Sequence, residues 1–414
     1  MRAGLEHATV RKCASAAVLA IVVLLFAAAP ALAKTFVPTR HDDPIPDSCK
    51  PHDCSLREAI TAANNRVGPD VVRVPRGHYK LALPDTGNDD NSDGDLDVLD
   101  EVTITGAGTH KTIIDGQHVS GVFAFLTFSP HSMSRLTVKG GLNPAGSGGA
   151  IAVGPSRLTL SRLRITGNSA QYGGGISGVA SPLILKNSTL DHNTASLAGG
   201  GADLAPGAVA IPRAVIKNTT FTEDRASEGG AVVNDGTSRF GGFDDKPAKL
   251  TMENSTVEGS SASGNGGGIA TVAGSTTSIG NTSVAFNISD SDASGGGNGG
   301  GIFQSAATFK VENSIVAGNF AGPTGMDDQC SGAFDGERNA LTTPTGCASF
   351  RSPANAVVKN LRLGHFGSHG GPTQTLSLKR GSAALGLARD CPSKDQRGVR
   401  RKHSRCDAGA FERP

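Results

Sequence analysis

The stretch Gly173-Gly174-Gly175-Ile176 decides the fold because it recurs along the chain. Six such glycine runs, each followed by a small or aliphatic residue, start at Gly148, Gly173, Gly199, Gly229, Gly266 and Gly299. The steps from one first glycine to the next are 25, 26, 30, 37 and 33 residues, which is the spacing of one structural unit that repeats. The chain is therefore predicted to be a repeat protein, and this periodicity argues against a flexible glycine-rich linker.

A second sequence pattern occurs at a fixed position before the glycine runs. In Leu183-Ile184-Leu185-Lys186-Asn187-Ser188-Thr189-Leu190, a short alternating strand leads to an Asn that can turn in the left-handed region, and a second strand follows. Three further segments align with this one, at Asn218, Asn254 and Asn313. Another turn comes three residues after an apolar one, as from Leu190 to Asn193. Each repeat is thus predicted to hold three short strands and three corners.

These features predict an all-β fold, a single-stranded right-handed parallel β-helix with three strands per coil. A solenoid of βαβ units would need a helical stretch of ten or more residues between the glycine runs, and the sequence has no such stretch there. The glycines suit corners where coils approach closely or where φ is positive. An Asn at one corner of successive coils can stack into an amide ladder inside the solenoid.

The beginning of the chain is predicted to direct export. Arg2, Arg11 and Lys12 precede the apolar run 14–29, and Ala31-Leu32-Ala33 fits the small-x-small cleavage pattern. We expect residues 1–33 to be a signal peptide and the mature protein to be secreted, whether extracellular, at the cell surface or in the periplasm. No later apolar stretch is long enough to predict a transmembrane segment.

The charge of the mature chain argues against nucleic acid as a partner. Without the leader, Lys plus Arg falls from 39 to 36 and Asp plus Glu from 37 to 36, so the formal net charge is zero. We expect a monomer.

Six of the seven cysteines lie in the mature chain, an even number that suits an oxidising compartment. Six cysteines allow fifteen pairings. Disulfides between cysteines that are close in sequence would cross-link the chain at each end of the repeat array. On that ground we predict Cys49 with Cys54, Cys330 with Cys347 and Cys391 with Cys406. A closed loop of about 15 residues contributes roughly 3 kcal/mol in the chain-entropy model.

A helix is predicted where the sequence reads Cys54-Ser55-Leu56-Arg57-Glu58-Ala59. Ser55 and Glu58 fit a capping box, and the apolar residues that follow lie on one helical face. A short amphipathic helix ahead of a solenoid would cover the unpaired strand edges of the first coil. We predict an N-terminal cap at 34–70, the β-helix at 71–321 and a C-terminal disulfide-containing module at 322–414.

Several motifs resemble known families. The six letters from Cys54 to Ala59 match the motif for which the exported bacterial CSLREA proteins are named, and 70–79 is similar to the first coil of such proteins. The glycine runs, with a preceding apolar-x-x-Asn, resemble the repeats of chlamydial polymorphic outer-membrane proteins and other pectin-lyase-like β-helices. The stretches 370–375, 381–384, 395–398 and 406–412 resemble the choice-of-anchor Q module, although Ala383 and Gly386 replace its usual Pro and Asp. The resemblance implies an exported or surface protein.

One acidic loop has a pattern typical of calcium binding. Counted from Asp89, side-chain oxygens fall at positions 1, 3, 5, 7, 9 and 12 with Gly94 at position 6, the layout of an EF-hand loop apart from Asp in place of Glu at position 12. The metal ligands would be Asp89, Asn91, Asp93, Asp95, Asp97 and Asp100. Predicted strands flank the loop where an EF-hand has helices, so a solvated acidic corner loop is the alternative. Ca²⁺ is the cofactor that the sequence suggests.

Charges also gather at one corner of two neighbouring coils, at Asp191, His192, Glu223, Asp224 and Arg225, and a predicted insert at 234–249 adds Asp235, Arg239, Asp244, Asp245 and Lys246. Catalysis on a β-helix needs charges clustered in one outer groove. The polygalacturonase patterns occur only as fragments, in Ser368-His369-Gly370 and Asp244-Asp245. No catalytic residue is therefore assigned. The basic stretch 397–405 is expected to form an exposed loop closed by Cys391 and Cys406, and weak contact with an acidic polysaccharide or lipopolysaccharide is the alternative.

Two function classes remain. The first is a non-enzymatic exported or cell-surface protein, adhesin-like or envelope-associated, that binds carbohydrate or another surface through its outer faces. The second is a polysaccharide lyase or glycoside hydrolase that acts in a groove on the β-helix. They differ in whether five carboxylates converge on a common point, namely Asp191, Glu223, Asp224, Asp235 and Asp244.

Overall fold

The computed structural model describes residues 32–179, 182–206, 213–238, 247–322, 325–348, 350, 352, 354–402 and 404–414. Residues 1–31 of the predicted signal peptide lie outside the described residues, as do Arg239, Asp244, Asp245 and Lys246 of the predicted insert. Within the described ranges, no helix is both long enough and apolar enough to cross a membrane.

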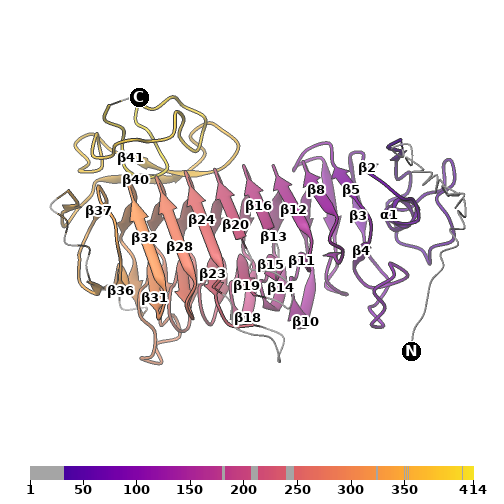
Figure 1. Cartoon of the computed structure of the whole chain (residues 1–414), viewed down its shortest axis with the longest axis horizontal. Coiled ribbons are helices and arrows are strands. Elements are labelled where there is room, and N and C mark those ends of the chain that lie inside the picture. The colour runs from indigo at the N-terminus through magenta and orange to yellow at the C-terminus, as the bar shows by residue number, and fades with distance from the viewer. Residues whose placement is uncertain are drawn as a thin grey trace, which may run out of the picture. The chain divides into compact units, whose positions relative to one another are not determined.

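The chain folds as a solenoid of stacked strands, and three long sheets run along it (Figure 1). The first sheet has ten strands, β1 (Thr35–Phe36), β2 (Asp70–Arg73), β5 (Val102–Thr105), β8 (Pro130–Ser134), β12 (Arg157–Ser161), β16 (Pro182–Lys186), β20 (Arg213–Lys217), β24 (Lys249–Glu253), β28 (Thr276–Gly280) and β32 (Thr308–Glu312). The second sheet has eleven, β3 (Gly77–Lys80), β6 (Thr112–Asp115), β9 (Thr137–Lys139), β13 (Arg164–Thr166), β17 (Thr189–Asp191), β21 (Thr220–Thr222), β25 (Thr256–Glu258), β29 (Ser283–Ala285), β33 (Ile315–Ala317), β37 (Ala340–Leu341) and β39 (Ala356–Val357).

The third sheet again has ten strands, β4 (Leu96–Val98), β7 (Phe123–Phe125), β11 (Ile151–Val153), β15 (Ile176–Val179), β19 (Ala202–Ala205), β23 (Val232–Asp235), β27 (Ile269–Val272), β31 (Ile302–Ser305), β36 (Cys330–Ala333) and β38 (Cys347–Ala348). The strands of all three sheets pair in parallel, as in β16 with β20 and β17 with β21. The predicted right-handed parallel β-helix with three strands per coil is confirmed.

A fourth, shorter sheet was not predicted. It lies between the second and third sheets in chain order and consists of β10 (Leu142–Ser147), β14 (Ser169–Tyr172), β18 (Thr194–Ala198), β22 (Arg225–Ala226), β26 (Ser261–Ala262), β30 (Ile288–Ser289), β34 (Phe320–Ala321) and β35 (Met326–Asp327). Many of its strands have only two residues, so no alternating pattern of apolar residues marks them in the sequence.

Each glycine run forms the corner that leads into the third sheet. Gly173 has φ +60°, which is in the left-handed region that glycine adopts at little cost. A Cβ on the following Gly174 would collide with the backbone carbonyl oxygen of Thr194 in the next coil. The first glycine therefore supplies the turn, and the second allows the close approach of the coils.

The Asn corners lie between the first and second sheets. Asn187 has φ +52° and Asn218 φ +51°, and the Asn218 side-chain amide donates to Asn187 Oδ1 at 3.2 Å. A separate polar ladder lies inside the solenoid, at the end of the second sheet. It consists of Asn168, Asn193, Asp224, Ser260, Asn287, Asn319 and Gln329. The predicted ladder is thus present inside the solenoid, at the corner that follows the second sheet.

The N-terminal helix α1 (Leu56–Asn64) has the predicted capping box. Ser55 Oγ accepts from the Glu58 amide at 3.2 Å, and Glu58 Oε2 accepts from the Ser55 amide at 2.6 Å. Leu56, Ala59 and Ile60 are buried in the main core, beside the first strands of the solenoid.

Strand stacking continues past residue 321, where the sequence predicted the solenoid to end. β37 and β39 extend the second sheet to Val357, and β36 and β38 extend the third. The later coils lack the glycine run that marks the earlier ones, because Asp328 and Gln329 precede β36. All three predicted disulfides are present, Cys49–Cys54, Cys330–Cys347 and Cys391–Cys406.

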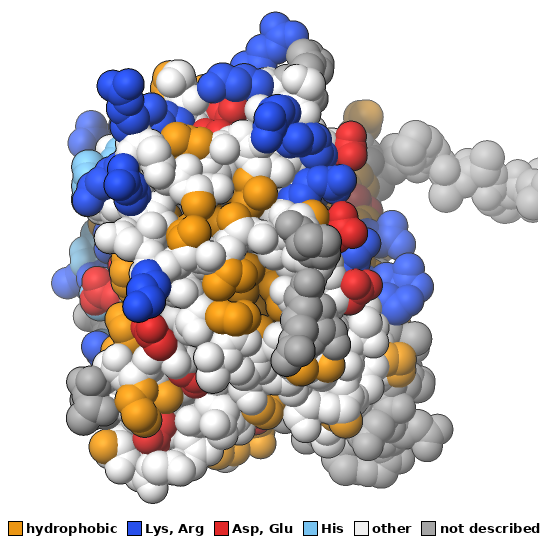
Figure 2. Space-filling model, turned by 90° about the vertical axis from the view of Figure 1, so that its left-hand side faces the viewer, with side chains coloured by type: hydrophobic (Ala, Val, Ile, Leu, Met, Phe, Trp, Pro, Cys, Tyr) orange, Lys and Arg blue, Asp and Glu red, His pale blue; other side chains and the backbone are white. Residues whose placement is uncertain are grey.

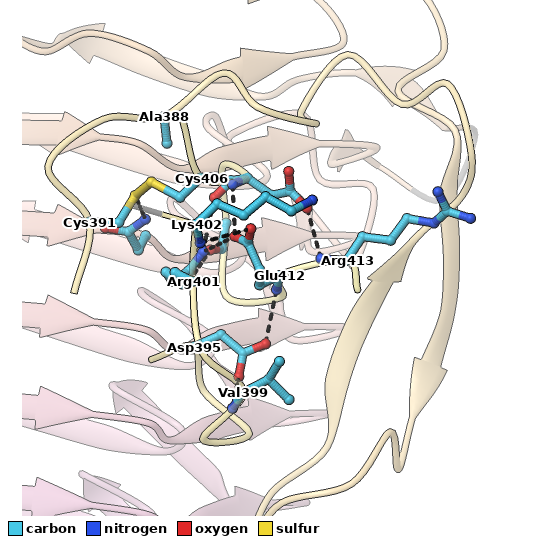
Figure 3. Close-up of polar contacts among 12 residues, drawn as sticks. Ala388, Cys391, Asp395, Val399, Arg401, Lys402, Cys406, Glu412 and Arg413 are labelled. Atoms are coloured by element: carbon cyan, nitrogen blue, oxygen red, sulfur yellow. Dashed lines mark hydrogen bonds and ion pairs between the residues drawn. A yellow bond between two sulfur atoms is a disulfide. The ribbon is translucent and has the colours of Figure 1, made fainter. Parts of the chain in front are cut away.

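The last part of the chain leaves the solenoid and returns along it. It contains the hairpin β40 (Leu363–Gly367) and β41 (Thr375–Leu378), and it lies above the later coils in Figure 1. Buried polar contacts hold this segment together, among them Asp395, Arg401 and Glu412 (Figure 3).

Candidate functional site

A groove of about 900 Å³ lies over the outer face of the second sheet. The C-terminal segment covers the later strands of this sheet: Thr220 Oγ1 donates to the Gln374 carbonyl at 2.6 Å, and Thr256 Oγ1 donates to Gln396 Oε1 at 2.7 Å. The groove opens where this cover ends. Its floor includes β13 and β17, and the loop 368–374 of the hairpin lines it on the other side.

Two arginines stack at the edge of the groove. Arg135 (φ +61°) and Arg162 (φ +53°) take the left-handed corner position that Asn187 takes in the next coil. The Arg135 amide donates to the Arg162 carbonyl at 3.1 Å, so the two residues sit on adjacent coils. The Arg135 guanidinium reaches only the Ala107 carbonyl, at 3.3 Å, and Arg162 has no side-chain hydrogen bond or ion pair within the described part of the chain.

A third arginine holds a buried carboxylate in the groove. Arg164 Nε and Nη2 donate to the two oxygens of Asp191 at 3.0 and 2.8 Å, and Thr166 Oγ1 donates to the same carboxylate at 2.8 Å. Burial alone would raise the pKa of Asp191, but the hydrogen bonds from Arg164 and Thr166 outweigh it and lower that pKa below its usual value. Asp191 is therefore a fixed negative charge at neutral pH.

The His192 ring lies between two carboxylates. Its Nδ1 is 3.1 Å from Asp191 Oδ2, and its Nε2 is 2.9 Å from Glu223 Oε2. Both contacts can be hydrogen bonds at once only when both ring nitrogens carry protons, because a carboxylate only accepts. The imidazole is more than half exposed in the groove, so it can exchange protons with solvent or with a bound molecule.

The five carboxylates named above are only partly brought together. Asp191 and Glu223 meet at His192. Asp224 points into the solenoid and accepts from Asn193, and Asp235 is buried on β23 of the third sheet. Asp244 lies outside the described residues.

Sequence reasoning missed the arginines of the groove. An alignment of Ser161-Arg162-Leu163-Arg164 with Lys186-Asn187-Ser188-Thr189 would have shown that Arg162 takes the place of the corner Asn. The contribution of the loop 368–374 could not have been found this way, because it depends on the C-terminal segment folding back over the solenoid.

The acidic loop of the predicted calcium site is held by a buried arginine. Arg57 is fully buried, pairs with both oxygens of Asp43 at 2.8 and 2.9 Å, and donates to the backbone carbonyls of Asp93, Gly94 and Asp95 at 2.7 to 2.9 Å. Asn91 is also buried, and its amide group bonds to the Arg57 carbonyl and to Thr61.

Two carboxyls of this loop lie close together with little access to water. Burial, followed by the charges of neighbouring carboxylates, raises the pKa of Asp95 to about 6 and that of Asp97 to about 7. Within the described residues, no group of three or more His, Cys, Asp or Glu side chains could hold a metal ion. Calcium binding by Asp89, Asn91, Asp93, Asp95, Asp97 and Asp100 stays a prediction.

Comparisons with known proteins find similarity only at the level of structure. No protein-family model matches the chain, and no curated protein matches it. Seven chains of solved structures do. They include pectate lyase Pel9A, at 16% identity over 93% of this chain and 98% of that one with a TM-score of 0.46. The similarity is one of fold alone.

Two further matches are more distant in shape. The A-module of the mannuronan C-5 epimerase AlgE6 from Azotobacter vinelandii is 16% identical over 73% of this chain and 94% of that one, with a TM-score of 0.36. The catalytic domain of a GH87 α-1,3-glucanase in complex with nigerose is 12% identical over 76% and 68%, with a TM-score of 0.25. The β-helix assignment stands on the strand pairing of this chain itself.

Proposed function

We propose that this protein binds an acidic polysaccharide in the groove over the second sheet, as an exported, non-enzymatic protein of the cell surface or envelope. The observation that carries the proposal is the placement of Arg135 and Arg162 at equivalent corners of adjacent coils, with Arg164 in the same groove. Two cations on adjacent coils repel each other. A bound anion would offset this repulsion, and a guanidinium suits a carboxylate because it can donate two parallel hydrogen bonds.

The lining of the groove suits a sugar polymer. Asn187 and Thr189 offer amide and hydroxyl groups, and Phe366 offers an aromatic ring. Because stacked coils repeat such groups at the strand spacing of about 4.8 Å, a linear chain can lie along the solenoid and meet similar partners at successive sugars. The three disulfides support an oxidising compartment and hence export.

The test is the affinity of the mature protein for polygalacturonate and alginate, measured by calorimetry, with neutral dextran as the comparison polymer. Arg135→Ser together with Arg162→Ser is expected to weaken binding of the acidic polymers by at least about tenfold, equivalent to about 1.4 kcal/mol. Arg157→Ser, at the exposed start of β12 in the first sheet, is the matched control and should bind like the parent. Unchanged affinity in the double variant would refute the groove as the binding site.

A second candidate, a polysaccharide lyase or glycoside hydrolase, is favoured by the position of His192 between Asp191 and Glu223. A histidine held by carboxylates can act as a general acid or base. Incubation with the same acidic polymers, followed by assays for unsaturated ends and for reducing ends, separates the two classes. If the parent forms such ends and Glu223→Gln does not, the protein is an enzyme. If the parent forms none, the non-enzymatic binding protein remains.

A further inference from the structure

The C-terminal segment 359–414 carries a charge opposite to that of the rest of the mature chain. It contains 12 Lys and Arg and 4 Asp and Glu, a net charge of +8. Residues 34–358 contain 24 Lys and Arg and 32 Asp and Glu, a net charge of −8. The zero net charge of the mature chain therefore conceals two regions of opposite sign.

Three of the four acids in this segment are internal. Asp395, Asp407 and Glu412 are at most 2% exposed. Asp395 accepts from Arg397 Nη2 at 2.6 Å, and Glu412 accepts from Arg401 Nη1 at 3.3 Å. The oxygens of Asp407 accept from the backbone amides of Gly386 and Arg413 at 2.8 and 2.7 Å. These acids hold the fold of the segment and do not balance the cations on its surface.

The remaining cations lie at the surface. Arg362, Lys379 and Arg380 flank the open end of the hairpin and are exposed. Lys402, Arg405 and Arg413 line a hollow of about 400 Å³ near the end of the chain. Figure 2 shows Lys and Arg side chains gathered at the top of this view of the molecule, where the C-terminal segment lies. These six residues are called the cationic surface below.

We propose that the cationic surface is a second binding site for an anionic polysaccharide, so that one polymer chain is held both there and in the groove. The idea extends the proposed function and rests on it for the choice of polymer. Two linked sites raise the affinity for a long chain without new contacts at either site. The loop 368–374 lines the groove, and Arg362 and Lys379 lie at the other end of the same hairpin.

The structure favours a polysaccharide over a lipid surface as the partner. Peripheral membrane binding combines cations with apolar side chains that enter the bilayer. Among the described residues of 359–414, no large hydrophobic side chain is among the exposed ones, and the nearest, Val357, belongs to the solenoid. A hydrated polyanion needs only the cations.

The experiment compares three variants of the whole mature protein in binding to long alginate, short alginate oligomers and vesicles of phosphatidylglycerol. Lys379→Ser, Arg380→Ser and Lys402→Ser together remove half of the cationic surface. Arg157→Ser, Lys186→Ser and Lys249→Ser remove the same charge from exposed positions of the first sheet and serve as the control. The third is the groove variant lacking Arg135 and Arg162.

For the cationic-surface variant, we expect affinity for long alginate to fall about tenfold or more, with a weaker salt dependence because fewer counterions are released. The control triple should change little. If the cationic-surface variant binds like the control while the groove variant fails, the second site is refuted and the groove stands. If the groove variant binds normally while the cationic-surface variant fails, the groove is refuted and the cationic surface stands. Binding to vesicles but not to alginate, or salt-sensitive self-association without polymer in sedimentation, would overturn the polysaccharide assignment.

Discussion

At the scale of single residues, the ladder inside the solenoid contains one carboxyl among amide and hydroxyl groups. Asn193 donates through Nδ2 both to Asp224 Oδ1 at 2.9 Å and to the Ile165 carbonyl at 3.0 Å. Asp224 accepts through Oδ1, but its buried Oδ2 has no partner. Burial first, and then the charges of Asp191 and Glu223, raise the pKa of Asp224 well above its usual value. Asp224 is therefore neutral in the folded protein around pH 4 and remains so above it.

Replacement of Asp224 by Asn should stabilise the protein at neutral pH. A group whose pKa is higher in the folded state stabilises the fold fully below its unfolded pKa near 4, and the stabilisation is lost as the pH rises toward the folded pKa. The amide of Asn cannot ionise and can donate as Asn193 does, so we expect a gain on the order of 1–3 kcal/mol. Urea denaturation at pH 4 and pH 8 should show a smaller pH dependence in Asp224→Asn.

Asp292 is exposed, so Asp292→Asn serves as the control and should leave the pH dependence of the parent unchanged. An identical pH profile in Asp224→Asn and the parent would contradict the buried neutral carboxyl.

Arg57 organises the N-terminal cap, and its removal should be costly. Substitution by Met would leave Asp43 buried without its partner and would free the carbonyls of Asp93, Gly94 and Asp95. Loss of one partner from a buried ion pair typically costs about 3–5 kcal/mol. Arg66→Met is the control and should cost less, because the Arg66 side chain is 38% exposed and water can take its place beside Asp70.

The two variants are compared by chemical denaturation of the mature protein. A cap that tolerated Arg57→Met as readily as Arg66→Met would show that the carbonyl contacts of Arg57 contribute little.

At the scale of elements, the glycine corners set how closely the coils can stack. A Cβ at Gly230 would meet the carbonyl oxygens of Gly267 and Ser261 in the next coil. Gly230→Ala is expected to destabilise the protein by about 1–3 kcal/mol, because the coils must move apart. Gly280 lies in β28 with no atom within 4 Å of such a Cβ, so Gly280→Ala should be neutral or slightly stabilising. Thermal melting of both variants provides the comparison, and equal melting temperatures would contradict this role of the corner.

The sequence predicted the elements whose signals repeat. The glycine runs and the corner Asn residues located strands of the three long sheets from residue 148 onward, and the capping box located α1. The later coils were not predicted because Asp328 and Gln329 stand where a glycine run would be. The short sheet was not predicted because strands such as Arg225–Ala226 are too brief to show a period.

The candidate site was predicted less well, for a physical reason. Asp191, His192 and Glu223 stood out because they are charges on adjacent coils. Arg162 did not, because a corner that Asn occupies elsewhere accepts any residue that can reach a positive φ. The groove itself depends on contacts between Thr220 and Gln374, which are 154 residues apart, and no local pattern encodes such a contact.

At the scale of the whole molecule, the C-terminal segment packs along the later coils and links them to one another. Gln396 is the centre of this contact: its Nε2 donates to Thr220 Oγ1 at 2.8 Å and to Thr373 Oγ1 at 2.9 Å, and its Oε1 accepts from Thr256 at 2.7 Å. A solenoid contacts itself only between neighbouring coils, so stability can differ along its length. The C-terminal segment should therefore make the coils that it contacts more stable than the earlier coils.

The variant Gln396→Ala tests whether the C-terminal segment stabilises only the coils that it contacts or the whole solenoid. It removes the acceptor of the Thr256 hydroxyl and one donor to the Thr220 hydroxyl, which keeps its bond to the Gln374 carbonyl, and the loss costs about 1–3 kcal/mol. Hydrogen exchange of the mature protein should then become faster in β21 and β25 and stay as it was in β3 and β6, which lie several coils away from the C-terminal segment. Because the loop 368–374 lines the groove beside this contact, affinity for an acidic polymer should fall together with the protection of β21. A uniform rise in exchange along all coils would mean that the solenoid unfolds as one cooperative unit and that the C-terminal segment is an integral part of it.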